Sequence, residues 1–178
     1  ERMRGFEGAL ASIGWHMIAT KNWEYWQHYP EGDAIDKLGR YQWYFHIHEP
    51  KKKNTADRGH IHLFAVERRS KRIVALRHLI AIDISHAGLP QRLFTVNGWV
   101  TGDAPRSSQW SWRALRDLRL NTGQRELDRF ITQTVRMYPR EIKKLLRDSD
   151  SKLRSFGTDR ARAAANRRVE ILGSISLV

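Results

Sequence analysis

Two runs of aromatic and β-branched residues, separated by a polar loop, predict a β-hairpin between residues 40 and 67. Side chains at positions i and i+2 of a strand lie on the same face, so each run has one face suited to burial. Two further apolar runs, Arg77–Ser85 and Pro90–Val96, predict a third and a fourth strand. Because short turns separate these runs, the pattern predicts an antiparallel meander of four or more strands.

Helical periodicity replaces strand alternation on both sides of this sheet. Residues 2–13 predict a short N-terminal helix, and a short apolar run at 15–19 follows it as a candidate strand. Towards the C-terminus, residues 124–137 and 139–155 carry apolar side chains at three- and four-residue spacing, which predicts two helices. The second of these begins with a proline, a residue suited to the first turn of a helix.

The pair at 158–159, Thr followed by Asp, is a typical N-cap and predicts a last helix ending near Gly173. The order helix, sheet, helices indicates an α+β fold. The length suits one domain over 1–178, with the sheet core at about 15–100 and the helical part at about 113–173.

Composition restricts the chemistry. The chain has no cysteine, which excludes disulfides, thiolate metal ligands and cysteine catalysis. Any metal site must therefore use imidazole, carboxylate or water. No apolar run is long enough to span a membrane and no signal-peptide pattern opens the chain, so we expect a cytoplasmic protein.

The chain is strongly basic, with a formal net charge of +13 and an isoelectric point near 10.6. Between Arg113 and Glu170 there are 16 Lys and Arg residues against 8 Asp and Glu residues. Such a surplus attracts polyanions, so nucleic acid or an acidic protein is an expected partner of the C-terminal helices. The alternatives are a solvated helical surface without a partner and a basic structural subunit of a larger assembly. The pattern says nothing about oligomeric state.

The predicted hairpin carries the tripeptide His-Ile-His twice, at 46–48 and at 60–62. A register with His48 opposite His60 also places His46 opposite His62, so that four imidazoles share one face. Directly opposed Cβ atoms lie about 4.5–5.5 Å apart in a sheet. Three or four of these rings can therefore converge on one divalent ion, and zinc, iron, copper, nickel and manganese all suit imidazole ligands. A proton relay, an anion pocket and a structural histidine ladder are the alternatives.

Other residues can complete such a site. His78 lies on the third predicted strand, where it is expected to share a face with Ile80, Ile82 and Ile84, and it is the best additional ligand. Glu49 follows the first tripeptide directly and is a weak candidate for a general base. Three protein ligands with one open position indicate catalysis, by a metal-dependent hydrolase or an oxygenase, whereas four ligands with closed geometry indicate a structural or storage site.

The strand around His60 and His62 resembles the His-hydrophobic-His strand of single-strand DNA nucleases, relaxases and Rep proteins. In those proteins two histidines bind a divalent ion and a tyrosine on a helix attacks phosphate. The resemblance implies that Tyr138, which precedes a predicted basic helix, is the candidate nucleophile. A second H-x-H pair on the neighbouring strand is unusual for that group.

Four segments together resemble an uncharacterised family of small bacterial proteins that pair an H-x-H strand with a Gly-His-aromatic-His strand. The segments are Trp26–Asp33, Tyr44–His48, Gly59–Phe64 and Arg92–Gly102. This chain departs from the pattern at Ile61, where an aromatic residue is common. The resemblance implies a bacterial origin and a shared histidine site, and it implies no particular reaction.

Overall fold

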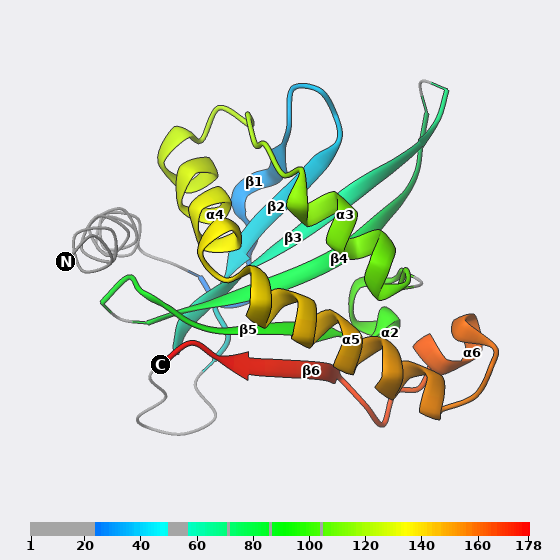
Figure 1. Cartoon of the computed structure of the whole chain (residues 1–178). Coiled ribbons are helices and arrows are strands. Elements are labelled where there is room, and N and C mark those ends of the chain that lie inside the picture. The colour runs from blue at the N-terminus through cyan, green and yellow to red at the C-terminus, as the bar shows by residue number, and fades with distance from the viewer. Residues whose placement is uncertain (1–23, 50–56, 71, 86, 104) are drawn as a thin grey trace.

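A six-stranded antiparallel sheet forms the centre of the molecule, with strands in the order β1-β2-β3-β4-β5-β6 (Figure 1). The computed structural model describes residues 24–49, 57–70, 72–85, 87–103 and 105–178. The predicted helix at 2–13 and the candidate strand at 15–19 lie outside these residues. The strands are β1 (Tyr29–Ile35), β2 (Tyr41–His46), β3 (Asp57–Arg69), β4 (Arg72–Ser85), β5 (Pro90–Val96) and β6 (Ile171–Ser176).

The helices belong mainly to the C-terminal half of the chain. They are α2 (Gly98–Thr101), α3 (Ser108–Arg116), α4 (Arg125–Met137), α5 (Pro139–Ser155) and α6 (Arg160–Ala164). The predicted α+β class and the antiparallel meander are confirmed. No helix in the described part of the chain is long and apolar enough to cross a membrane.

The prediction of a helix from 158 to 173 is wrong in its second half. The Asp159 side chain caps α6 as expected, by accepting hydrogen bonds from two backbone amides, but the helix ends at Ala164. The apolar residues that follow form β6, which pairs with β5 and supplies its backbone groups with partners. Gly173 is therefore not a helix end. A Cβ atom at this position would lie 2.5 Å from Ser149 Oγ, so glycine lets α5 pack closely on β6.

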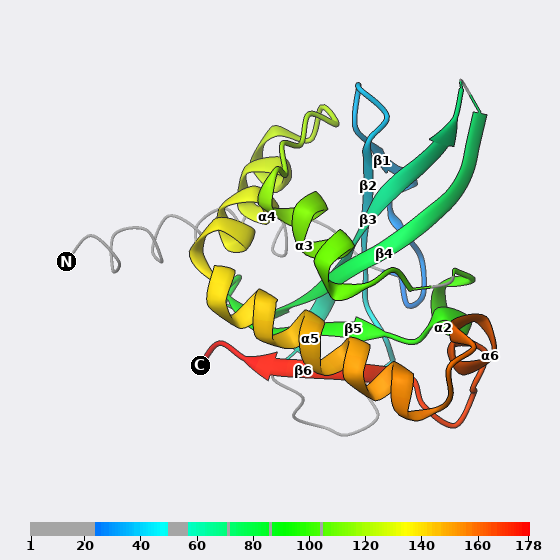
Figure 2. The same ribbon diagram turned by 45° about the vertical axis from the view of Figure 1, so that its right-hand side comes forward.

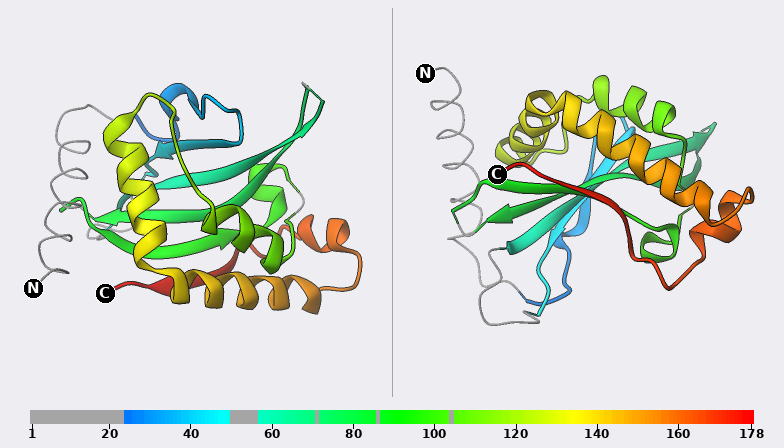
Figure 3. Two further views of the ribbon diagram at one scale, coloured as in Figure 1. Left: turned by 45° about the horizontal axis from the view of Figure 1, so that its top comes forward. Right: turned by 60° about the horizontal axis from the view of Figure 1, so that its bottom comes forward.

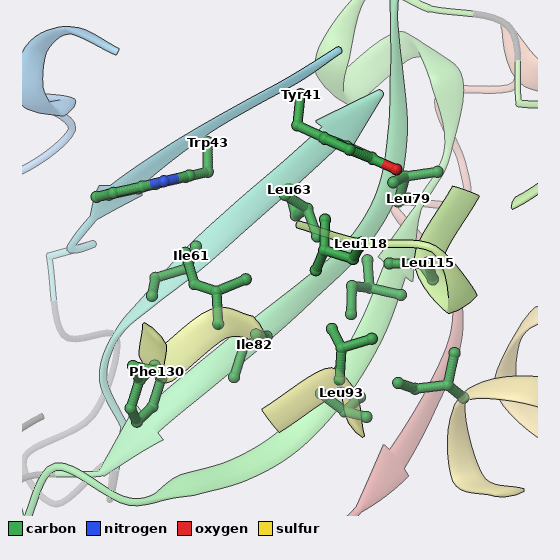
Figure 4. Packing of buried hydrophobic residues seen from close by; sticks show 14 of the residues in the cluster. Tyr41, Trp43, Ile61, Leu63, Leu79, Ile82, Leu93, Leu115, Leu118 and Phe130 are labelled. Carbon is green, nitrogen blue, oxygen red and sulfur yellow. The ribbon is translucent and has the colours of Figure 1, made fainter. Parts of the chain in front are cut away.

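Helices α3, α4 and α5 all lie on one face of the sheet (Figures 2 and 3). Alternate side chains of the strands bury against them, and Figure 4 shows this core around Trp43, Ile61 and Phe130. The Trp43 indole N–H donates to Asp128 Oδ1 on α4 at 3.0 Å, so the core also contains a directed polar contact. The opposite face of the same strands carries the histidines.

Candidate metal centre

Strands β2 and β3 pair in a register that differs by two residues from the predicted one. His46 lies opposite His60, and Tyr44 lies opposite His62. His48 lies beyond the end of β2, where a bridge between Ile47 and Tyr25 replaces the hairpin ladder. Because side chains alternate with a period of two, a shift by two leaves every histidine on its expected face. The predicted opposition of His48 and His60 is wrong, but the predicted patch forms.

The imidazole nitrogens converge at the end of β2. His46 Nε2 lies 2.7 Å from His60 Nε2 and 3.3 Å from His48 Nε2. One ring nitrogen from each of His46, His60 and His62 lies within 4.8 Å of the other two. Nitrogens bound tetrahedrally to one ion at about 2.0–2.1 Å are roughly 3.3 Å apart. Small side-chain movements would therefore bring the nitrogens of these three histidines, called the trio below, to the spacing that one ion requires.

His78 reaches this face through a β-bulge. It lies opposite Phe64, while Ile80 lies opposite Leu63, so Leu79 is an extra residue in β4. The expectation that His78 shares a face with Ile80, Ile82 and Ile84 is therefore wrong, because the isoleucines point into the helix-covered core. His78 Nε2 lies 3.0 Å from His62 Nδ1, so His78 contacts one member of the trio at its Nδ1 atom.

Asp83 supports His60 in a similar way. Its side chain is fully buried, and its Oδ1 lies 3.4 Å from His60 Nδ1 and has no hydrogen-bond partner within the described residues. Its Oδ2 accepts a hydrogen bond from Arg92 Nε at 2.5 Å. A carboxylate beside Nδ1 favours the tautomer that carries its proton there, which leaves the Nε2 lone pair of His60 directed at the cluster. Metal-binding histidines are commonly oriented by such a carboxylate.

Replacing Asp83 with Asn should lower metal affinity about 10–100-fold, because a neutral amide loses the electrostatic attraction of the carboxylate for a proton on His60 Nδ1. Competition with a chromophoric chelator measures the affinity, and circular dichroism verifies the fold. Asp36→Asn is the matched control, since Asp36 is equally buried but binds the backbone amide of Asn121 instead. An unchanged affinity in folded Asp83→Asn protein would show that Asp83 does not orient His60.

Burial keeps three of the clustered imidazoles neutral. Burial, followed by the neighbouring histidines, lowers the pKa of His46 to about 2, and burial, followed by His60, lowers the pKa of His78 to about 3. The pKa of His62 also falls well below its ordinary value, first through burial and then through the neighbouring His78, His60, His46 and His48. Neutral imidazole is the form that binds metals, so no proton has to be removed from these three rings at neutral pH.

The trio lines a pocket with a volume of about 360 Å³. Its lining includes Trp26, His28, Tyr44, Phe94, Val96 and Ile171. Trp26 stacks on His48 at a ring-centroid distance of 4.1 Å, and His28 stacks on Tyr44 at 3.6 Å. The aromatic segment before β1 is thus part of the pocket wall. Burial, together with the nearby Asp33, raises the pKa of Tyr44 to about 12, so its phenol stays protonated.

The sequence did not predict the polar contacts that join His28, Asp33 and Gln42 beside the trio. Asp33 Oδ1 lies 3.0 Å from His28 Nδ1, and Gln42 Nε2 donates to Asp33 Oδ2 at 2.6 Å. Asp33 adopts a left-handed backbone conformation with φ of 59°. Unfavourable backbone of this kind clusters at functional sites. Both His28 and Asp33 lie in a segment that carries the family resemblance, which was the available signal.

The two expected catalytic residues do not join the trio. Glu49 is exposed after the end of β2. Tyr138 lies between α4 and α5 and packs against the core on the helix-covered face. The sheet therefore separates Tyr138 from the histidines, and the arrangement of a tyrosine nuclease is not assembled here. Many basic side chains are exposed on α4 and α5, and a polyanionic partner for them stays a prediction.

A family model described as "Domain of unknown function (DUF6969)" matches residues 7–177. The match spans nearly the whole chain and confirms the resemblance to an uncharacterised family. No curated protein and no solved structure matches the chain.

Proposed function

The chain belongs to the DUF6969 family, whose description names no activity, and from its own geometry we propose that it binds one divalent transition-metal ion. The ligands are His46, His60 and His62, and His48 lies beside them, with its Nε2 atom 3.3 Å from His46 Nε2. The observation that carries the proposal is the convergence of three ring nitrogens within 4.8 Å of one another.

The chemistry of the donors supports this proposal. An all-imidazole set suits zinc, iron, copper, nickel or manganese better than calcium or magnesium, which prefer oxygen ligands. Three protein ligands beside a pocket leave a coordination position for water or substrate, as in catalytic sites. A bound ion of this kind supplies Lewis acidity or an activated water, so we assign the protein to the metal-dependent hydrolases or oxygenases.

The surrounding residues have separate tasks in this proposal. Asp83 and His78 contact the Nδ1 atoms of His60 and His62, which leaves the Nε2 atoms of these rings for the ion. His28 lines the pocket while its Nδ1 is engaged by Asp33, so its Nε2 is available to a ligand at the open position.

Reconstitution tests the proposal directly. Protein purified without a histidine tag, stripped with chelator and loaded separately with zinc, iron, copper, nickel and manganese should retain close to one equivalent of at least one metal after desalting. Elemental analysis by mass spectrometry gives the ratio. Less than about one tenth of an equivalent with all of these metals would refute the proposal.

A further inference from the structure

We propose that the metal centre acts on a small organic monoanion whose body is apolar or aromatic. This inference rests on the proposed metal site and adds the class of its substrate. It follows from four features of the pocket: the charge around the trio, the position of Arg92, an apolar wall that begins next to His60, and the carboxylate of Glu170.

The first feature is an uncompensated positive charge. His46, His60 and His62 are neutral ligands, so a bound divalent ion keeps its full charge. The nearest carboxylate, Asp83, is already paired with Arg92 at 2.5 Å and adds no net negative charge. An anionic ligand at the open position is therefore favoured over a neutral or cationic one. The net charge of +13 also favours the approach of anions.

The second feature is a directional donor beside the ion. Arg92 lines the pocket, its side chain is 36% exposed, and its guanidinium lies 4.9 Å from the centroid of the Phe94 ring. Its Nε binds Asp83, and within the described residues its terminal nitrogens form no hydrogen bond. Guanidinium groups bind carboxylates through such paired N–H donors. Asp83 thus connects the His60 ring to Arg92, the residue whose guanidinium would hold the anion.

The third feature is the apolar wall. Phe94 and Val96 are buried with Ala81 on the histidine face of the sheet, and Ile171 packs against them. The Phe94 ring meets the His60 ring edge to face at a centroid distance of 5.2 Å. A ligand bound to the ion therefore has an apolar surface directly beside it. A volume of about 360 Å³ suits a single small molecule, near the lower end of ligand pockets.

The fourth feature is a carboxylate in the pocket wall, which limits the substrate to one negative group. Glu170 is the single carboxylate among the described residues that line this pocket, and it is exposed. Its backbone oxygen accepts a hydrogen bond from the backbone amide of Asn97 at 2.7 Å, which holds it just before β6. A second anionic group on a ligand in this pocket would be repelled by this carboxylate. The geometry therefore points to a monoanion.

Probe binding to the full chain loaded with one equivalent of cobalt(II) tests this inference. Benzoate, benzamide and benzylamine share a ring and differ in charge, while acetate has the charge without the ring. Benzoate should bind at least tenfold tighter than each of the other three, by calorimetry and by the change in the cobalt absorption spectrum. Benzamide or benzylamine binding as tightly as benzoate would overturn the inference, and so would acetate.

Two variants locate the probe in this pocket. Val100→Trp, which places a large side chain at a pocket-lining residue outside the proposed set of metal ligands, should reduce benzoate binding at least tenfold and leave cobalt content at one equivalent. Arg92→Lys keeps the charge beside Asp83 but removes the guanidinium fork, and it should weaken benzoate several-fold. Arg77→Lys is the matched control, since Arg77 pairs with Glu67 instead.

The outcomes separate the two proposals. Full cobalt content with no preference for benzoate, or with benzoate binding unaffected by Val100→Trp, would overturn the substrate class and leave the metal site intact. Failure of the unmodified chain to hold cobalt or any other metal would overturn both.

Discussion

Replacing His46 with Ala should abolish stoichiometric metal binding and lower affinity by more than the 10–100-fold expected for loss of a supporting residue. His46 Nε2 lies 3.3 Å from His48 Nε2 and 2.7 Å from His60 Nε2. Its removal leaves the remaining nitrogens without a common centre. His46 is only partly buried, so alanine should be tolerated by the fold. Isothermal titration with the metal retained by the unmodified protein gives the affinity.

Glu49→Gln is the control for this experiment, because Glu49 is close in sequence but exposed and outside the trio. It should retain the affinity of the unmodified protein. The double variant His46→Ala with His62→Ala should bind no metal at all. A His46→Ala protein that still holds one equivalent with unchanged affinity would remove His46 from the site.

The metal-free protein should lose stability as the pH falls below about 6.5. Burial lowers the pKa values of His46 and His78 to about 2 and about 3 in the folded chain, whereas the unfolded chain keeps ordinary values near 6.5. Between these limits the unfolded state binds more protons, so the free energy of unfolding falls with falling pH. A single such group lowers it by up to about 1.4 kcal/mol per pH unit. Urea unfolding of chelator-treated protein at pH 7.5 and pH 5.5 measures the difference.

His78→Gln provides the comparison for the acid effect. The variant removes one buried imidazole, so its unfolding midpoint should change less between pH 7.5 and pH 5.5 than that of the unmodified chain. Equal midpoints for the unmodified chain at both pH values would show that the buried imidazoles are not kept neutral by the fold.

Much of the fold follows from local patterns. β5 and α5 have the predicted bounds, because the pattern of apolar residues that predicts each element continues without interruption from its first residue to its last. The C-terminal strand could not be predicted in this way. Its apolar residues fit a helix equally well. The strand is favoured only by tertiary contacts: β6 pairs with the open edge of β5, and Ser149 packs closely against Gly173.

The sequence predicted which histidines form the candidate site, but it did not predict which of them lie opposite one another in the hairpin. The two H-x-H tripeptides fix which face the rings occupy, because alternation depends only on sequence parity. The pairing partner depends on where β2 ends, and there Ile47 forms a bridge with Tyr25, a residue outside the hairpin. The bulge at Leu79 changes the parity of β4, so His78 and Ile80 lie on opposite faces. Asp83 and Arg92 were missed because their relevance appears only when β4 and β5 lie side by side.

Anomalous diffraction from crystals of the metal-loaded protein, recorded at the absorption edge of the metal, locates the bound ion. We expect one strong peak about 2.0–2.1 Å from a ring nitrogen of each of His46, His60 and His62. A fully loaded crystal with its peak elsewhere, or with these rings turned away from one another, would contradict the proposed metal site.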